Sequence, residues 1–236
     1  PVDGEFILTS DDLLRLEHVP KEVIVIGCGV IGVEYASMLA KLGISVTIVD
    51  GRARPLEFLD DQIIDELVGQ MRSNNVYFRL GETVDTLKIE KGKTPRVLIL
   101  LQSGKQIEGD VALVCAGRIG ATKNLNLTAA GLKTDARGRL EVDNYFRCAV
   151  PHIFAAGDVI GYPSLAATSS EQGRLAACAA FGVDAKPMAK HFPVGVYSIP
   201  EVSMVGMTEQ DLKIKNVPYE IGVARYREIA RGQILD

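Results

Sequence analysis

Apolar and polar residues follow two alternating spacings in the first third of the chain. Continuous β-branched runs over residues 23–26 and 45–49 are typical of strands that are covered on both faces of a parallel sheet. Between them, residues 29–42 place apolar side chains at helical spacing, and a second helix is predicted from about Asp60. The alternating residues 76–80 predict a third strand. This order predicts an α/β fold built on a doubly wound parallel sheet.

Shorter elements follow this first unit. Predicted strands over 84–89 and 97–101, joined by turn-rich sequence, indicate a β-meander on one face of the sheet, and residues 111–115 predict a further buried strand. Beyond them we predict strands over 140–142, 153–156, 194–199 and 202–205, and an alanine-rich helix over about 168–181. The chain is therefore predicted to contain more than one lobe.

Composition narrows the choice of partners. The 236 residues include 26 Lys and Arg against 30 Asp and Glu, with a net charge of −4 and a pI near 5.5. That balance provides no electrostatic footprint for nucleic acid or for an anionic membrane. No apolar run reaches the length of a bilayer span, and the N-terminal residues lack the pattern of a signal peptide. We expect a soluble, cytoplasmic protein that binds small molecules.

The four cysteines are widely spaced and form neither a CxxC pair nor a metal-ligating cluster with the three histidines. Cys115 and Cys178 lie in apolar surroundings, where free cysteine packs as a small hydrophobic residue. The sequence therefore predicts no metal site.

The turn between the first strand and the first long helix has the pattern GxGxxG, in Gly27-Cys28-Gly29-Val30-Ile31-Gly32. The first glycine makes the tight turn, the second lets a pyrophosphate approach the backbone, and the third packs helix against strand. The helix N-terminus offers unpaired N–H groups and a partial positive charge to that diphosphate. Asp50 ends the next strand, where its carboxylate can accept hydrogen bonds from both ribose hydroxyls. This spacing predicts a dinucleotide site.

The charges beside Asp50 leave the choice of dinucleotide open. A carboxylate repels the 2′-phosphate of NADP and so favours NAD, but Arg52 and Arg54 follow at once. A guanidinium can bind that phosphate bidentately. The alternative is that each arginine is a solvated loop charge.

Two more residues have both a functional and a structural interpretation. Glu34 lies one turn into the helix and can hydrogen-bond a carboxamide or tether a cation, or it can be a plain surface glutamate. Val84 begins a predicted strand and can support an adenine ring or pack in the core.

A second group of residues indicates a flavin site. Apolar residues 153–157 deliver Asp158 to the carboxyl edge of a predicted sheet, where it can accept from a ribityl hydroxyl or simply cap a turn. Residues 161–167 lead into the alanine-rich helix. Backbone N–H groups and the positive end of that helix could face the flavin pyrimidine and stabilise negative charge on reduced flavin.

Together these segments resemble the pyridine nucleotide disulfide oxidoreductase family of flavoproteins. The resemblance is found in residues 27–34, Cys115-Ala-Gly-Arg118, residues 135–142, residues 153–158, and residues 199–202 with 205–209. These motifs stand in the family's order and span the whole chain. The resemblance implies a Rossmann-like FAD/NAD(P)-binding fold and FAD as cofactor. A narrower resemblance within the family, found in residues 157–166, 217–222 and 230–234, implies NAD(H) and NADP(H) as substrates and hydride exchange between NADPH and NAD+ through flavin N5.

The family pattern also assigns residues. It implies nicotinamide dinucleotide contacts at Gly27, Cys28, Gly29, Val30, Ile31, Gly32, Val33, Glu34, Asp50, Val84 and Gly117, and FAD contacts at Asp158, Ser164, Leu165, Ala166 and Ala167. Arg52 joins the dinucleotide site as a candidate for its charge alone. A homo-oligomer is implied as well. The alternative activities are a disulfide reductase of the dihydrolipoamide dehydrogenase type and a module that only binds a dinucleotide.

Two parts of the family pattern are not found in this sequence: an earlier FAD segment with its own GxGxxG and, in disulfide reductases, a CxxxxC pair, and the later part of the interface domain. We therefore expect an internal piece that has no catalytic residue and is inactive alone. The expected division is a connector (1–22), an NAD(P)-binding domain (23–118), the later part of a FAD-binding domain (119–190) and the start of an α+β dimerisation domain (191–236).

Overall fold

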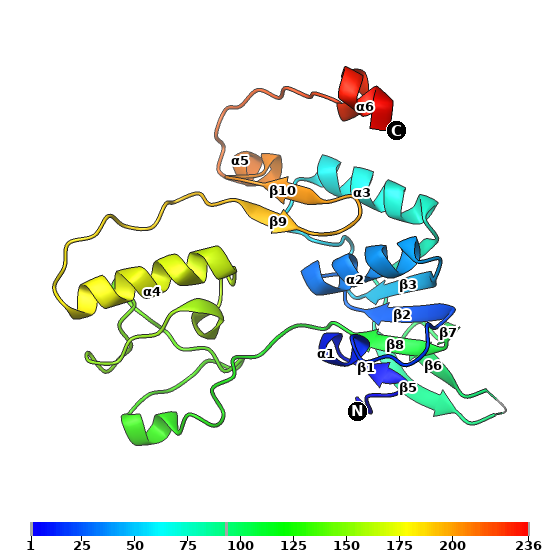
Figure 1. Cartoon of the computed structure of the whole chain (residues 1–236), viewed down its shortest axis with the longest axis horizontal. Coiled ribbons are helices and arrows are strands. Elements are labelled where there is room, and N and C mark those ends of the chain that lie inside the picture. Colours follow the sequence, from blue (N-terminus) through cyan, green and yellow to red (C-terminus); the bar gives the residue numbers. More distant parts are fainter. Residues whose placement is uncertain (1, 93, 236) are drawn as a thin grey trace.

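The computed structural model describes residues 2–92 and 94–235. Its centre is a sheet with strand order β1-β8-β2-β3-β4, in which each neighbouring pair runs parallel (Figure 1). The strands are β1 (Ile7–Leu8), β2 (Glu22–Ile26), β3 (Ser45–Asp50), β4 (Val76–Leu80) and β8 (Val111–Val114). The parallel sheet predicted from buried β-branched runs is confirmed. Strand β1 was not predicted, because two residues are too short to show a period.

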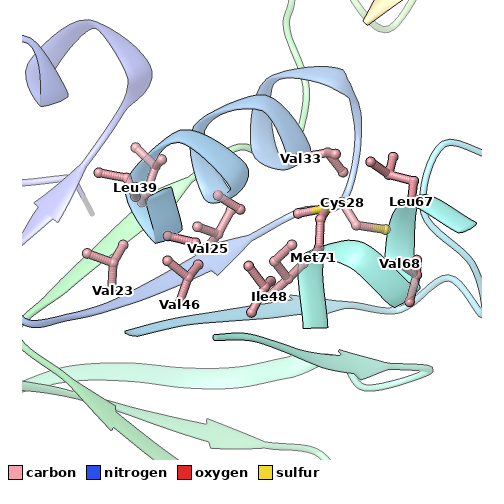
Figure 2. Packing of buried hydrophobic residues seen from close by; sticks show 14 of the residues in the cluster. Val23, Val25, Cys28, Val33, Leu39, Val46, Ile48, Leu67, Val68 and Met71 are labelled. Atoms are coloured by element: carbon pink, nitrogen blue, oxygen red, sulfur yellow. The ribbon is translucent and has the colours of Figure 1, made fainter. Parts of the chain in front are cut away.

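Helices α2 (Val30–Lys41) and α3 (Asp61–Ser73) cover one face of this sheet. Figure 2 shows how Val25 and Ile48 from the strands meet Val33 of α2 and Met71 of α3 in one buried cluster. The short helix α1 (Ser10–Leu13) precedes β2 and is capped by Thr9. Burial of these apolar faces against the sheet is the main source of helix stability.

An antiparallel meander covers the other face. It consists of β5 (Val84–Glu90), β6 (Arg96–Leu101) and β7 (Gln106–Gly109). The side chains of Val97 and Ile99 pack against Ile24 and Ala112 of the parallel sheet. The predicted meander is confirmed, although its third strand, β7, was not predicted. The parallel sheet lies between the meander and the two helices.

The chain then leaves the sheet for a separate group of elements, drawn in green and yellow in Figure 1. It contains the short 3-10 helices η1 (Leu127–Ala130) and η2 (Gly157–Ile160) and helix α4 (Ala166–Ala180). A small core of Leu132, Leu140, Cys148 and Ala155 holds it together.

The strands predicted over 140–142 and 153–156 are wrong. The Leu140 N–H donates to the Val159 carbonyl and the Ala155 N–H donates to that of Phe146. These single bonds, with one bridge between Arg147 and Phe154, do not extend into a ladder. Leu140 and Ala155 are buried, and Val142 and Ile153 pack against them. A strand also needs a neighbour along its length, and none is present among the described residues.

The last segment returns to the helical side of the sheet. Strands β9 (Val194–Val196) and β10 (Val202–Met204) pair antiparallel, and Val196 and Met204 pack into the core formed with α2 and α3. Helix α5 (Glu209–Ile214) begins with a capping box formed by Thr208 and Asp211. The described chain ends with η3 (Tyr226–Glu228) and α6 (Ala230–Leu235).

Two adjacent isoleucines of α3 test this packing. Ile64 is 1% exposed and Ile63 is 47% exposed. We expect Ile64→Ala to lower the free energy of unfolding by about 2–5 kcal/mol, because it removes buried methyl groups and leaves a cavity. The matched control Ile63→Ala is expected to cost about 1 kcal/mol or less. Urea unfolding measures both, and equal losses would contradict the assigned helix face.

Candidate functional site

The predicted dinucleotide turn is one of the most closely packed points of the molecule. Gly27 has φ +114, and a Cβ atom there would lie 2.5 Å from the Cys115 carbonyl oxygen. A Cβ atom at Gly32 would lie 1.9 Å from the Gly27 carbonyl oxygen. The first and third glycines of the pattern are therefore required by the protein's own backbone.

Gly29, the second glycine, is different. Its φ is −75. The nearest atom that a Cβ there would meet in the described structure, apart from its chain neighbours, is Arg52 Nη2 at 3.9 Å. Gly29 is also the N-cap of α2 and provides no side-chain cap to the first N–H groups of that helix. Open space in front of uncapped backbone donors fits an anionic group such as a pyrophosphate.

Asp50 lies at the end of β3, beside this turn. Its Oδ2 atom accepts hydrogen bonds from the Cys28 N–H at 2.7 Å and from Arg52 Nη2 at 2.7 Å. Its Oδ1 atom accepts from the Arg52 N–H at 2.8 Å and from Arg52 Nε at 2.9 Å. The carboxylate is thus bound to the motif backbone on one side and to the Arg52 guanidinium on the other.

These contacts fix protonation states at the turn. Burial acts to raise the pKa of the Asp50 carboxyl, but hydrogen bonds from Arg52 and Cys28 outweigh it and hold that pKa well below its usual range. Burial, reinforced by the Asp50 carboxylate, raises the pKa of the Cys28 thiol to about 12. Near neutral pH the carboxylate is charged and the thiol is protonated, so Cys28 contributes its backbone N–H and has no nucleophilic sulfur.

The structure separates the two arginines that the sequence left equivalent. Arg54 turns away from Asp50 to the first turns of α3, where it forms ion pairs with Asp61 and Asp65. Arg52 alone of the two reaches the Asp50 carboxylate.

Two other predicted residues have clear structural partners. The Glu34 carboxylate accepts the Tyr197 N–H at 2.7 Å, which joins α2 to the chain just after β9. Val84 is partly buried and packs against the core beneath the meander. Gly117 has φ +117, and within residues 2–92 and 94–235 no atom beyond its two chain neighbours lies within 4 Å of its Cβ position. Their cofactor contacts stay predictions.

A cleft of about 1000 Å³ brings the two predicted sites together. Val30 and Ile31, from the start of α2, line one part of it, and Asp158, Ser164 and Leu165 line another. The remaining predicted site residues do not line it. The cleft therefore joins only the inner ends of the two predicted binding regions.

The predicted flavin segment is shaped by local hydrogen bonds. The buried Gln172 side chain accepts the Gly157 N–H at 2.7 Å, and the Ser164 hydroxyl donates to the Gly161 carbonyl at 2.8 Å. Asp158 is exposed. Helix α4 begins at Ala166 with Leu165 as its N-cap, and no side chain caps its first turn. The N–H groups of Ala166 and Ala167 thus lie at an uncapped helix start beside the cleft.

Several cleft residues were not predicted as site residues. Tyr162 and Phe192 both line the cleft, and their ring centroids lie 5.9 Å apart. Lys190 and His191 add basic side chains to the same segment. Residues 190–192 have no regular secondary structure and thus no apolar period by which the sequence could reveal them.

Neither a metal-ligating cluster nor a membrane-spanning helix is found among the described residues. Within residues 2–92 and 94–235, no group of three or more His, Cys, Asp or Glu side chains is arranged to hold a metal ion. None of the helices described is both long and apolar enough to cross a bilayer. All four cysteines, which lie within these ranges, are free thiols.

Known proteins resemble this chain over nearly its whole length. A soluble pyridine nucleotide transhydrogenase from Mycobacterium bovis is 49% identical over 232 residues, covering 98% of this chain and 49% of the relative. One from Hahella chejuensis is 44% identical over 238 residues, covering 99% and 51%. The chain therefore spans about half the length of the curated relatives it matches.

Solved structures share the fold. LpdA from Mycobacterium tuberculosis superimposes with a TM-score of 0.90 at 28% identity, covering 99% of this chain and 50% of that one. The HOCl-induced flavoprotein disulfide reductase RclA from Escherichia coli gives a TM-score of 0.90 at 27% identity, covering 100% and 53%. Residues 2–173 match the family model described as pyridine nucleotide-disulphide oxidoreductase. With most of its residues inside that match, the chain belongs to the pyridine nucleotide-disulphide oxidoreductase family.

Proposed function

We propose that this chain is part of a flavoprotein that uses FAD to transfer hydride between NADPH and NAD+. The observation that supports the proposal most directly is the shared cleft. It is lined by Val30 and Ile31 of the dinucleotide motif and by Asp158, Ser164 and Leu165 of the flavin segment. Hydride transfer needs its two cofactors in contact, and this cleft offers both binding regions to one space.

The proposed dinucleotide-binding site is built on the turn before α2. The uncapped N–H groups after Gly29 would bind the pyrophosphate, and the open Gly29 Cβ position would let it approach the backbone. Asp50 and Arg52, which are bonded to each other, would lie at the adenosine end, where NAD and NADP differ. Gly27, Cys28, Val33, Glu34, Val84 and Gly117 would complete the site.

The proposed flavin-binding site is built on η2 and the start of α4. Asp158 is exposed and would accept a hydrogen bond from the ribityl chain. Ser164, Leu165, Ala166 and Ala167 would surround the pyrimidine with N–H donors and the positive end of the α4 dipole. FAD, when bound, supplies the redox group that accepts hydride from one dinucleotide and returns it to another. The chain itself contributes binding, orientation and electrostatics, with no catalytic residue of its own.

The relatives support this assignment over a disulfide reductase. Proteins that are 44% to 49% identical over nearly the whole chain are named soluble pyridine nucleotide transhydrogenases. RclA, which is named a disulfide reductase, is 27% identical. The reductase stays as the second candidate because the fold is shared. A homo-oligomer formed through the dimerisation domain expected from residue 191 onward is part of the same proposal.

The second glycine provides a test of dinucleotide binding. We expect Gly29→Ala to leave the free energy of unfolding unchanged, because the new methyl group meets no protein atom closer than 3.9 Å. The methyl group would occupy space needed by the pyrophosphate, so the Kd for NAD+ is expected to rise about tenfold, or about 1.4 kcal/mol. Isothermal titration calorimetry measures the binding.

Gly32→Ala is the matched control in the same turn. Its Cβ atom would lie 1.9 Å from a backbone oxygen, so this variant is expected to lose about 2 kcal/mol or more of folding stability. Unchanged NAD+ affinity in a folded Gly29→Ala protein would contradict the pyrophosphate position.

The reaction itself is testable with the intact FAD-loaded protein. We expect it to reduce the thionicotinamide analogue of NAD+ at the expense of NADPH, with ping-pong kinetics, because the two dinucleotides use one cleft in turn. The absorbance of the reduced analogue reports the rate. Reduction of lipoamide or another disulfide without transhydrogenation would instead support the second candidate.

A further inference from the structure

The hydrogen-bonding capacity of the Asp50 carboxylate is already used within the chain. A carboxylate has about four acceptor sites, two on each oxygen. Oδ2 accepts from the Cys28 N–H and Arg52 Nη2, and Oδ1 accepts from the Arg52 N–H and Arg52 Nε. The Asp50 side chain is only 10% exposed, whereas that of Arg52 is 41% exposed. The guanidinium therefore covers the carboxylate from the solvent side.

NAD cannot use Asp50 in this arrangement. The two ribose hydroxyls of its adenosine half would donate to a carboxylate, but each oxygen already accepts two hydrogen bonds. Withdrawal of the Arg52 side chain would free one site on Oδ1 and one on Oδ2. The bonds from the Cys28 N–H and the Arg52 N–H would remain and hold the carboxylate in place. The two freed acceptor sites match the two ribose hydroxyls of NAD.

NADP has the opposite requirement. Its 2′-phosphate is an acceptor with negative charge, and a bare carboxylate would repel it. While Arg52 stays on Asp50, that carboxylate is neutralised. Arg52 has five N–H donors, and the side-chain bonds to Asp50 use those of Nε and one of Nη2. Three donors remain for a phosphate.

We propose that the ion pair between Asp50 and Arg52 is a two-state selector at the adenosine end of the dinucleotide site: closed, it binds NADP(H), and open, it binds NAD(H). The inference rests on the proposed dinucleotide site and adds the way in which one site accepts both ligands. Arg52 is a specificity-determining residue that competes with the ribose of NAD for Asp50. Its position beside Gly29, with Nη2 3.9 Å from the Cβ position, places it on the same side of the turn as the proposed pyrophosphate site.

Binding of NAD+ and NADP+ to the intact FAD-loaded protein tests this selector. The oxidised dinucleotides avoid hydride transfer to FAD, so calorimetry reports binding alone. We expect Arg52→Ala to raise the Kd for NADP+ by about 10- to 100-fold, because a charged hydrogen-bond partner of the phosphate is lost. The Kd for NAD+ is expected to fall several-fold, because the internal competitor is gone.

Asp50→Asn should produce the reverse pattern. The variant loses the carboxylate that receives the ribose hydroxyls, so the Kd for NAD+ is expected to rise about tenfold or more. Arg52 becomes free for phosphate, and the Kd for NADP+ is expected to stay the same or to fall. Adenosine 2′,5′-bisphosphate and 5′-AMP, which lack nicotinamide, should repeat both patterns and locate the effect at the adenosine end.

Arg54→Ala is the matched control. It removes the same charge from the same loop, but Arg54 pairs with Asp61 and Asp65 rather than with Asp50. Both Kd values are expected to change by the same small factor. Thermal unfolding of each variant confirms that it is folded.

The outcomes separate this inference from the proposed function. If the wild-type protein binds neither dinucleotide, the proposed function fails and the selector with it. If the wild-type protein binds both, the effect of Arg52→Ala decides. If Arg52→Ala then raises the Kd values for NAD+ and NADP+ by equal factors, or raises that for NAD+ more, the selector is overturned while the dinucleotide site stands. Opposite shifts in Arg52→Ala support it.

Discussion

The close approach of helix α2 to strand β2 at the Gly27–Gly32 turn sets the geometry on which the rest of the site depends. Helix α2 starts so near strand β2 that a side chain at Gly32 would overlap the Gly27 carbonyl, and one at Gly27 would overlap the Cys115 carbonyl. These two glycines let three backbone segments converge at the carboxyl edge of the sheet. The start of α2 is thereby held over the end of β2 with its N–H groups uncovered.

Strand register carries this constraint to the neighbouring strand. Ile26 of β2 pairs with Val49 of β3, so Asp50 follows directly beside the glycine turn. The Cys28 N–H is then within 2.7 Å of the Asp50 carboxylate. On the far side of α2, Glu34 accepts the Tyr197 N–H and Ser37 accepts the Ile199 N–H. The same helix therefore presents the proposed pyrophosphate site and anchors the segment after β9.

The sequence predicted those elements that a local pattern decides. Strands β2 and β3, helices α2 and α3 and strands β5 and β6 of the meander were all predicted, because each shows its burial in a continuous or periodic apolar pattern of its own. The predicted strands over 140–142 and 153–156 were wrong, because strand formation depends on a neighbour that no local pattern reports.

Charges near the site were harder to predict than the fold. Arg52 and Arg54 are equivalent in the sequence, and the acidic first turns of α3 decide between them by pairing with Arg54. From the sequence, Asp50 and Arg52 were interpreted as separate determinants of dinucleotide choice, whereas in the structure they form an ion pair. The domain division and the membership of each cofactor site stay predictions.

A site that binds two ligands differing by one phosphate faces a physical conflict. A fixed carboxylate would repel the phosphate, and a fixed guanidinium would leave the ribose hydroxyls without an acceptor. An ion pair with one half-exposed partner resolves this, because the exchange is matched bond for bond. Asp50 loses two side-chain hydrogen bonds when Arg52 withdraws, two ribose hydroxyls replace them, and the guanidinium moves into solvent. Arg52, with 41% of its side chain exposed, can therefore give way to two ribose hydroxyls, yet remain on Asp50 when a phosphate arrives.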